Sequence, residues 1–239
     1  MISNDTIKIL ANKYQTTELN IRREYFQHLF LSYFYRQPKT NKIYFKDGTA
    51  LRIIYQSPRF SEDLDFSSSL CSVKAVEEII VAALAEIERE GIEAEIQEAK
   101  STTGGYLAII IFKASRQIVK TQIEISLRRG KKTGEAATIA SDFIPPYILI
   151  QLTQAELVDE KIEALFARKK PRDFYDLYFI IRANLLPAGK RNVLSDVLKT
   201  LKQSKICFDR ELKQFLPKSH WTMIKDFPAA LEREVKRFC

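Results

Sequence analysis

The 239-residue chain is poor in cysteine, glycine and proline, and these shortages exclude several classes of protein. Its three cysteines, Cys71, Cys207 and Cys239, stand at irregular spacings that fit neither a disulfide framework nor a metal cluster. Only 7 glycines and 8 prolines accompany a hydrophobic content of 46%, which is typical of a compact globular protein and not of a disordered one. The chain can therefore bury a substantial core, in one large domain or two small ones.

Long apolar runs are lacking as well. The best candidates, residues 107–112 and 148–152, fall far short of the roughly 18 consecutive apolar residues that a membrane span needs. The first 15 residues have no basic head followed by an apolar run, so we expect no signal peptide. These features predict a cytoplasmic protein with no membrane partner.

Basic residues outnumber acidic ones in this chain. The chain has 38 lysines and arginines against 30 aspartates and glutamates, for a net charge of +8. Such an excess favours a polyanionic partner, because neutralising phosphates releases counterions and supplies affinity without sequence preference. Many soluble proteins carry the same charge for solubility alone, so the charge by itself leaves a nucleic-acid partner open.

Apolar periodicity predicts two helical regions in the first part of the chain. Residues 1–36 carry apolar and aromatic side chains at helical spacing, and the pattern stops near Pro38. Residues 73–90 present one apolar face, and Gly91 is well placed to end that helix.

Strands are predicted between and after these helices. Residues 106–114 are nearly all apolar, as expected for a strand buried on both faces. Residues 118–128 alternate cleanly between apolar and polar side chains. The candidates are residues 43–45, 64–66, 92–99, 106–114 and 118–128.

The segment of residues 130–146, with its glycines and the pair Pro145-Pro146, is a predicted domain boundary. The pattern after it is mainly helical. We therefore predict an α+β domain over residues 1–145 and a helical domain over residues 146–239.

Two acidic residues, Asp63 and Asp65, stand two apart in the segment of residues 60–66. In an extended segment they point to the same side, while Leu64 and Phe66 anchor the other. Two carboxylates held this way repel each other unless a cation lies between them, and Mg²⁺ prefers such oxygen ligands. An ordinary acidic surface turn is the alternative.

Upstream residues could bind phosphate. Gly48 and Thr49 end a probable strand before an apolar helical turn, where backbone N–H groups and the Thr49 hydroxyl can approach a phosphate. An ordinary tight turn would have the same sequence. Arg59 and Ser61 could also contact phosphate oxygens, or Arg59 could pair with Glu62 on the surface.

Glu124 is the best-placed third metal ligand. It lies in the middle of the alternating strand, on its polar face, where a charged residue usually has a partner or lines a cavity. An exposed sheet face that pairs Lys120 with Glu124 fits the same pattern.

A second region with candidate functional residues begins on a predicted helix, where Lys161 and Arg168 lie two turns apart and project in nearly the same direction. Pro171 ends that helix or begins the next. The next helix, residues 174–181, is apolar almost all round, which indicates a buried element.

Two acids lie on one side of this buried helix, Asp173 and Asp176, and buried acids need cations. The local supply is Lys161, Arg168 and Arg172. The outcome is either a structural salt-bridge network or a cluster in which the acids orient Lys161 toward a triphosphate.

Together these segments resemble the AbiEii/AbiGii-type toxin family, the nucleotidyltransferases of type IV toxin–antitoxin and phage-defence systems. The order and separation of the motifs match over about residues 20–185, and Asp47 stands where the family commonly has a second glycine. The resemblance rests on Lys46-Asp47-Gly48-Thr49-Ala50-Leu51, on Arg59-Phe60-Ser61-Glu62-Asp63-Leu64-Asp65-Phe66, and on Lys161 followed by Arg172-Asp173-Phe174-Tyr175-Asp176-Leu177.

The resemblance implies an α+β fold with a DNA-polymerase-β-like core, in which helices flank a mixed β-sheet, and a helical C-terminal half. It also implies transfer of nucleotides from a nucleoside triphosphate, in some members to the 3′ end of tRNA, which blocks translation. An antitoxin encoded nearby is the usual partner.

We expect the catalytic residues to be Asp63, Asp65, Lys161 and Asp173, with Mg²⁺ held by Asp63, Asp65 and Glu124. The expected nucleotide-binding residues are Gly48, Thr49, Arg59, Ser61, Lys161, Arg168, Arg172 and Asp176. Two other functions stay open at this point: transfer to a small-molecule or protein acceptor, and a catalytically silent RNA-binding module.

Overall fold

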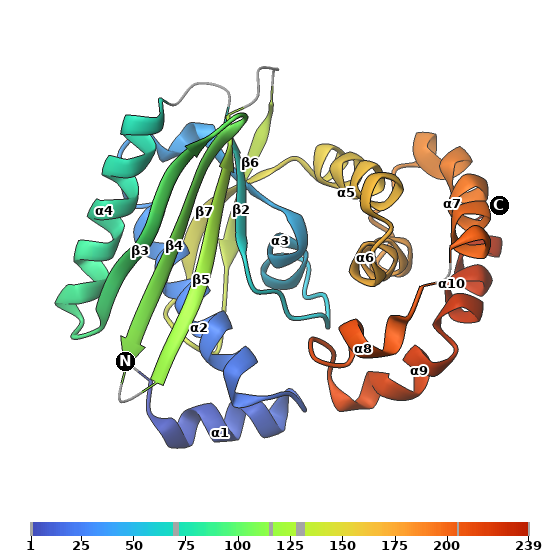
Figure 1. The fold of residues 1–239 in the computed structure, drawn as a ribbon, viewed down its shortest axis with the longest axis horizontal. Coiled ribbons are helices and arrows are strands. Elements are labelled where there is room, and N and C mark those ends of the chain that lie inside the picture. The colour runs from blue at the N-terminus through green and yellow to red at the C-terminus, as the bar shows by residue number, and fades with distance from the viewer. Residues whose placement is uncertain (1, 69–71, 115–116, 128–131, 205, 239) are drawn as a thin grey trace. The chain divides into compact units, whose positions relative to one another are not determined.

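The computed structural model describes residues 2–68, 72–114, 117–127, 132–204 and 206–238 (Figure 1). The chain divides into two compact units. The sheet unit consists of Met1–Gln56 and Phe60–Thr153, and the helical unit consists of Ser57–Arg59 and Gln154–Cys239.

The boundary between the units lies after Thr153, further along the chain than the predicted 145/146. The reason is a hairpin that the sequence analysis missed. Strands β6 (Gly134–Ile139) and β7 (Tyr147–Leu152) pair antiparallel, and β7 also pairs with β1 (Ile43–Lys46). Residues 134–139 of the predicted linker are therefore part of the sheet, while residues 130 and 131 lie outside the described residues.

Within the described residues, seven strands form one mixed sheet in the order β3-β4-β5-β2-β1-β7-β6. The pairs β2–β5 and β1–β7 are parallel, and the other neighbours are antiparallel. The mixed sheet is as predicted. The strands not yet given are β2 (Leu64–Ser68), β3 (Glu93–Thr102), β4 (Gly105–Ala114) and β5 (Gln117–Ser126).

Burial along β4 and β5 shows how the sheet is covered. In β5 the predicted alternation is confirmed: Ile123 and Ile125 are buried, and Glu124 between them is exposed. The prediction that β4 is buried on both faces is wrong, because Tyr106 and Ile110 are buried while Leu107 is only half-buried. Helix α4 packs on β3 and β4 and helix α2 packs on β5, which explains why one side of these strands is deeply buried (Figure 1).

The sheet unit contains helices α1 (Asn4–Lys13), α2 (Glu18–Phe34), α3 (Asp47–Ile53) and α4 (Val73–Arg89). The helical region predicted over residues 1–36 is thus two helices, because the side chain of Thr17 caps α2 by accepting from the Asn20 amide. Gly91 ends α4 as predicted, with φ of 78° in the left-handed region that favours glycine.

The helical unit is built around α6 (Pro171–Arg182), which packs against α5 (Gln154–Arg168), α8 and α10. Pro171 is the first residue of α6. Of the two predicted alternatives, that Pro171 ends one helix or begins the next, the second is confirmed. The segment after Leu186 packs Phe227 against Tyr175 and Tyr178 of α6, and Phe208 lies beside Phe227. The remaining helices are α7 (Leu194–Gln203), α8 (Phe208–Leu212), α9 (Trp221–Lys225) and α10 (Phe227–Lys236).

None of the helices in the described ranges combines the length and the apolar character that crossing a membrane requires.

Candidate active site

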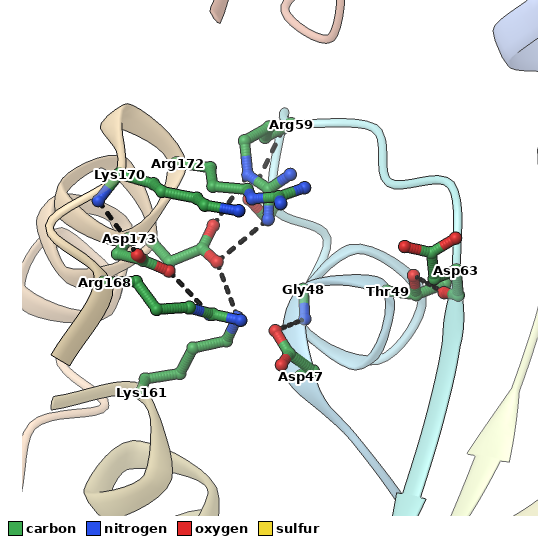
Figure 2. A network of polar contacts seen from close by, with 12 residues as sticks. Asp47, Gly48, Thr49, Arg59, Asp63, Lys161, Arg168, Lys170, Arg172 and Asp173 are labelled. Atoms are coloured by element: carbon green, nitrogen blue, oxygen red, sulfur yellow. Dashed lines mark hydrogen bonds and ion pairs between the residues drawn. The ribbon is translucent and has the colours of Figure 1, made fainter. Parts of the chain in front are cut away.

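The turn from β1 into α3 differs from the predicted one. Gly48 and Thr49 are not at the end of a strand but in the first turn of α3, which begins directly after Lys46. Asp47 has a φ of 65°, and its own Oδ1 accepts a hydrogen bond from the Gly48 amide at 2.6 Å (Figure 2). The amide predicted to face a phosphate therefore already bonds the Asp47 carboxylate.

Thr49 is completely buried, and its hydroxyl donates to the backbone carbonyl of Asp63 (Figure 2). The Thr49 hydroxyl, which was predicted to bind a phosphate, thus donates its hydrogen bond to the protein backbone instead. What the contact does is tie the first turn of α3 to the residue just before β2.

Asp63 lies directly before β2, and Asp65 is the second residue of this strand. Leu64 and Phe66 are fully buried, whereas Asp63 and Asp65 are half-buried. Asp65 is the register partner of Glu124 on the parallel strand β5, so the side chains of Asp65 and Glu124 leave the same face of the sheet. Lys46 on β1 is the antiparallel partner of Asp65 and adds a positive charge to that face.

The carboxylates suit a magnesium ion by their chemistry. Among the described residues, no three or more histidine, cysteine, aspartate or glutamate side chains gather into a group that could hold a metal. Mg²⁺ is commonly held by one or two carboxylates together with substrate phosphates and water, so a pair of chain ligands is sufficient. That Asp63 and Asp65 hold the ion, with Glu124 as a third ligand, stays a prediction.

The segment before the acids is held by residues that the sequence analysis missed. Gln27 on α2 is buried, and its amide donates to the carbonyls of Ser61 at 2.9 Å and Glu62 at 3.1 Å. Glu62 pairs with Arg23 at 2.7 Å. The predicted alternative that Arg59 pairs with Glu62 is therefore wrong.

Arg59 belongs to the helical unit and is buried there. Its Nε and Nη2 donate to the two carboxylate oxygens of Asp176 at 2.7 and 2.9 Å, and Lys161 Nζ donates to the same carboxylate at 2.7 Å (Figure 2). Burial raises the pKa of Asp176, but the charges and hydrogen bonds of Arg59 and Lys161 outweigh it and hold that pKa below its ordinary value. The carboxylate is therefore ionised and orients both cations.

Asp173 has a separate set of partners. It accepts from Arg168 Nη2 at 2.7 Å and from the Lys170 amide at 3.1 Å, which caps the start of α6 (Figure 2). Arg172 pairs instead with Glu211, with 3.5 Å between Nε and Oε1. The prediction that these two acids hold nearby cations is confirmed, by Lys161 at Asp176 and by Arg168 at Asp173. A catalytic role of Asp173 stays a prediction.

Solved structures of other proteins share this fold. MenT4, a nucleotidyltransferase toxin from Mycobacterium tuberculosis, matches with a TM-score of 0.69 and 17% identity over 100% of this chain and 93% of its own. JHP933 from Helicobacter pylori matches with a TM-score of 0.67 and 18% identity over 93% of each chain. At these identities the likeness shows the fold.

The family follows from the sequence itself. The model of the nucleotidyl transferase AbiEii toxin family of type IV toxin–antitoxin systems matches residues 29–238, and the chain belongs to this family. The resemblance drawn from the motifs is thereby confirmed. No curated protein sequence matches the chain.

Proposed function

We propose that this member of the toxin family is a magnesium-dependent enzyme that transfers nucleotides from a nucleoside triphosphate to RNA, at the 3′ end of tRNA, and so blocks translation. The observation that carries the proposal is the pair Asp63 and Asp65, held at the start of β2 beside the first turn of α3. A cognate antitoxin is the proposed protein partner.

In this proposal Asp63 and Asp65 bind the metal, with Glu124 on the same face of the sheet as a further ligand. Bound Mg²⁺ supplies charge neutralisation on the phosphates and lowers the pKa of the acceptor hydroxyl. The chain contributes the fixed carboxylates, and Gly48 and Ser61 lie on the segments that flank them.

The basic residues of the helical unit are assigned to phosphate binding. Lys161 is buried and kept oriented by Asp176, so its ammonium group is a fixed positive charge and not a mobile one. Arg168 and Arg172 are more exposed, with side-chain exposures of 40% and 34%, and can reach phosphate oxygens of a nucleotide or of RNA. Arg59, which shares Asp176 with Lys161, is assigned to nucleotide binding as well, and Asp173, which holds Arg168, to catalysis.

The RNA acceptor is supported by the net charge of +8. A polyanionic acceptor releases counterions on binding, so its KM rises steeply with salt, whereas the KM for a small acceptor changes little. The dependence of KM on salt concentration therefore tests this part of the proposal.

The test of the whole proposal is incubation of the purified protein with total tRNA, Mg²⁺ and each of the four α-³²P-labelled nucleoside triphosphates. We expect label at the 3′ end of tRNA with at least one nucleotide. Asp63→Asn should abolish transfer while the melting temperature stays equal or rises, because it removes repulsion between two neighbouring carboxylates.

The matched control is Asp5→Asn, which neutralises an exposed carboxylate in the first turn of α1. Normal transfer by Asp63→Asn would refute the metal-binding role of Asp63. If none of the four nucleotides is transferred to tRNA, the proposal that tRNA is the acceptor is refuted.

A further inference from the structure

Asp63 lies where regular secondary structure does not hold the backbone. The chain from Ile54 to Asp63 is neither helix nor strand, and β2 begins only at Leu64. The hydrogen bonds between strands, which fix the backbone of a strand residue, therefore do not fix the backbone of Asp63.

Side chains from two helices do this instead. Gln27 of α2 donates to the carbonyls of Ser61 and Glu62, and Thr49 of α3 donates to the carbonyl of Asp63. Three successive backbone carbonyls thus each accept a hydrogen bond from a side chain of another element.

Both donors are buried, with exposures of 1% for Gln27 and 0% for Thr49. A buried donor or acceptor that loses its partner pays the full cost of desolvation, so these contacts strongly favour one position of the segment. The salt bridge between Arg23 and Glu62 acts on the same segment, but both side chains are partly exposed, and it contributes less.

We propose that Gln27 and Thr49 are positioning residues of the nucleotidyltransferase site, which hold the backbone of residues 61–63 so that the Asp63 carboxylate is preorganised for a divalent cation. This inference rests on the proposed function. It adds two residues that act through Asp63 and do not touch the substrate, and it gives Thr49 a role different from phosphate binding.

The prediction is a loss of metal affinity when either donor is removed. Partners of metal ligands typically contribute about 10–100-fold to metal affinity or activity. We expect Thr49→Val and Gln27→Met each to raise the Kd for Mn²⁺ about tenfold or more. Thr49→Ser keeps the hydroxyl and should bind Mn²⁺ within about twofold of wild type.

Two matched controls remove similar contacts elsewhere in the sheet unit. Thr40→Val deletes a buried threonine hydroxyl that donates to the Gln37 carbonyl at 2.8 Å, at the other end of β1 from α3. Gln37→Met deletes an amide that donates to the Tyr33 carbonyl at 3.1 Å. Both should lower the melting temperature slightly and leave Mn²⁺ binding unchanged.

The experiment measures free Mn²⁺ by electron paramagnetic resonance, with and without a non-hydrolysable nucleoside triphosphate, next to melting curves of every variant. Transfer is then followed against Mg²⁺ concentration, where Thr49→Val should need more Mg²⁺ for half-maximal rate and regain much of its kcat at saturation. Thr49→Val replaces only the hydroxyl group by a methyl group, so this variant remains informative if Gln27→Met fails to fold.

Asp63→Asn separates the two proposals. If Asp63→Asn loses Mn²⁺ binding but Thr49→Val binds as wild type does, the positioning inference is overturned and the proposed function stands. If wild type does not bind Mn²⁺ in either condition, or Asp63→Asn binds it normally, the metal site of the proposed function fails and the inference fails with it.

Discussion

Asp47 adopts a backbone conformation that favours glycine. Its φ of 65° lies in the left-handed region, which glycine adopts without strain and which aspartate tolerates better than most residues. Its carboxylate then bonds the Gly48 amide at 2.6 Å. The side chain thus places a negative charge on the turn that the resemblance assigns to phosphate binding.

Replacing Asp47 by glycine should therefore strengthen nucleotide binding. Asp47→Gly removes the charge and leaves the Gly48 amide able to donate to a phosphate, and a charge-assisted hydrogen bond contributes about 1.5–3 kcal/mol. We expect the KM for the nucleoside triphosphate to fall about tenfold or more, measured in the labelled transfer assay.

Asp47→Asn is the control, since it keeps an oxygen acceptor for the Gly48 amide and removes only the charge. Its KM should lie between those of wild type and Asp47→Gly. A KM for Asp47→Gly equal to that of wild type would show that this turn does not bind the phosphates.

Among the elements, α2 joins the most parts of the sheet unit. It supplies Gln27 to the segment before β2, Glu24 to a buried salt bridge with Arg52 of α3, and His28 to the hydroxyl of Tyr147 at 3.0 Å. Burial, and secondarily the charge of Arg52, lower the pKa of His28 from 6.5 to about 3. The histidine is therefore neutral in the folded protein.

Because His28 is buried and neutral, we expect the folded protein to lose stability in acid. The unfolded chain binds a proton at His28 below its ordinary pKa of 6.5, while the folded chain does not do so until about pH 3, so stability is lost as the pH falls through this window. We expect about 2 kcal/mol of the unfolding free energy to be lost between pH 7 and pH 5 from this group alone.

Urea unfolding of wild type and His28→Asn at the two pH values isolates the contribution. The variant should be less stable at pH 7, because a buried side chain is replaced, but its loss on acidification should be smaller by the same amount. Equal losses in both proteins would contradict the lowered pKa of His28.

Which elements could be predicted depended on their length and regularity. Helix α4 and strand β5 have long, clean patterns, so both were predicted. The helical turn predicted after Thr49 is part of α3, but α3 begins earlier, at Asp47, because a helix of only seven residues shows too little of the helical period to locate its start. Strand β6 was missed because it is a short edge strand of small residues.

Contacts between distant residues could not be predicted from local patterns. The Gln27 amide reaches carbonyls 34 and 35 residues away, and Arg59 bonds Asp176 across 117 residues, so neither pairing leaves a periodic trace in the sequence. The acids of α6 were expected to need cations, but their partners were not specified by the spacing.

At the scale of the whole molecule, the chain does not divide at one point. It leaves the sheet unit after Gln56, returns at Phe60, and leaves again after Thr153. The short segment Ser57–Arg59 belongs to the helical unit, where Arg59 forms a buried pair with Asp176.

The buried pair should dominate the stability of the helical unit. Removing one partner of a buried pair costs about 3–5 kcal/mol where the other charge is left uncompensated, and Lys161, which still binds Asp176, reduces this cost for Arg59. An exposed pair is worth only about 0.2–1 kcal/mol. We expect Arg59→Met to lower the unfolding free energy more than Arg23→Met, which removes the partly exposed partner of Glu62. Denaturant unfolding of the two variants measures both, and equal losses would contradict the structural role of Arg59.

The way residues 57–59 join the helical unit also constrains how the protein can evolve. A single recombination event near residue 153 would bring together an arginine 59 from one ancestor and an aspartate 176 from another. Chimeras between distant relatives should therefore keep full stability of the helical unit only where both parents carry this pair.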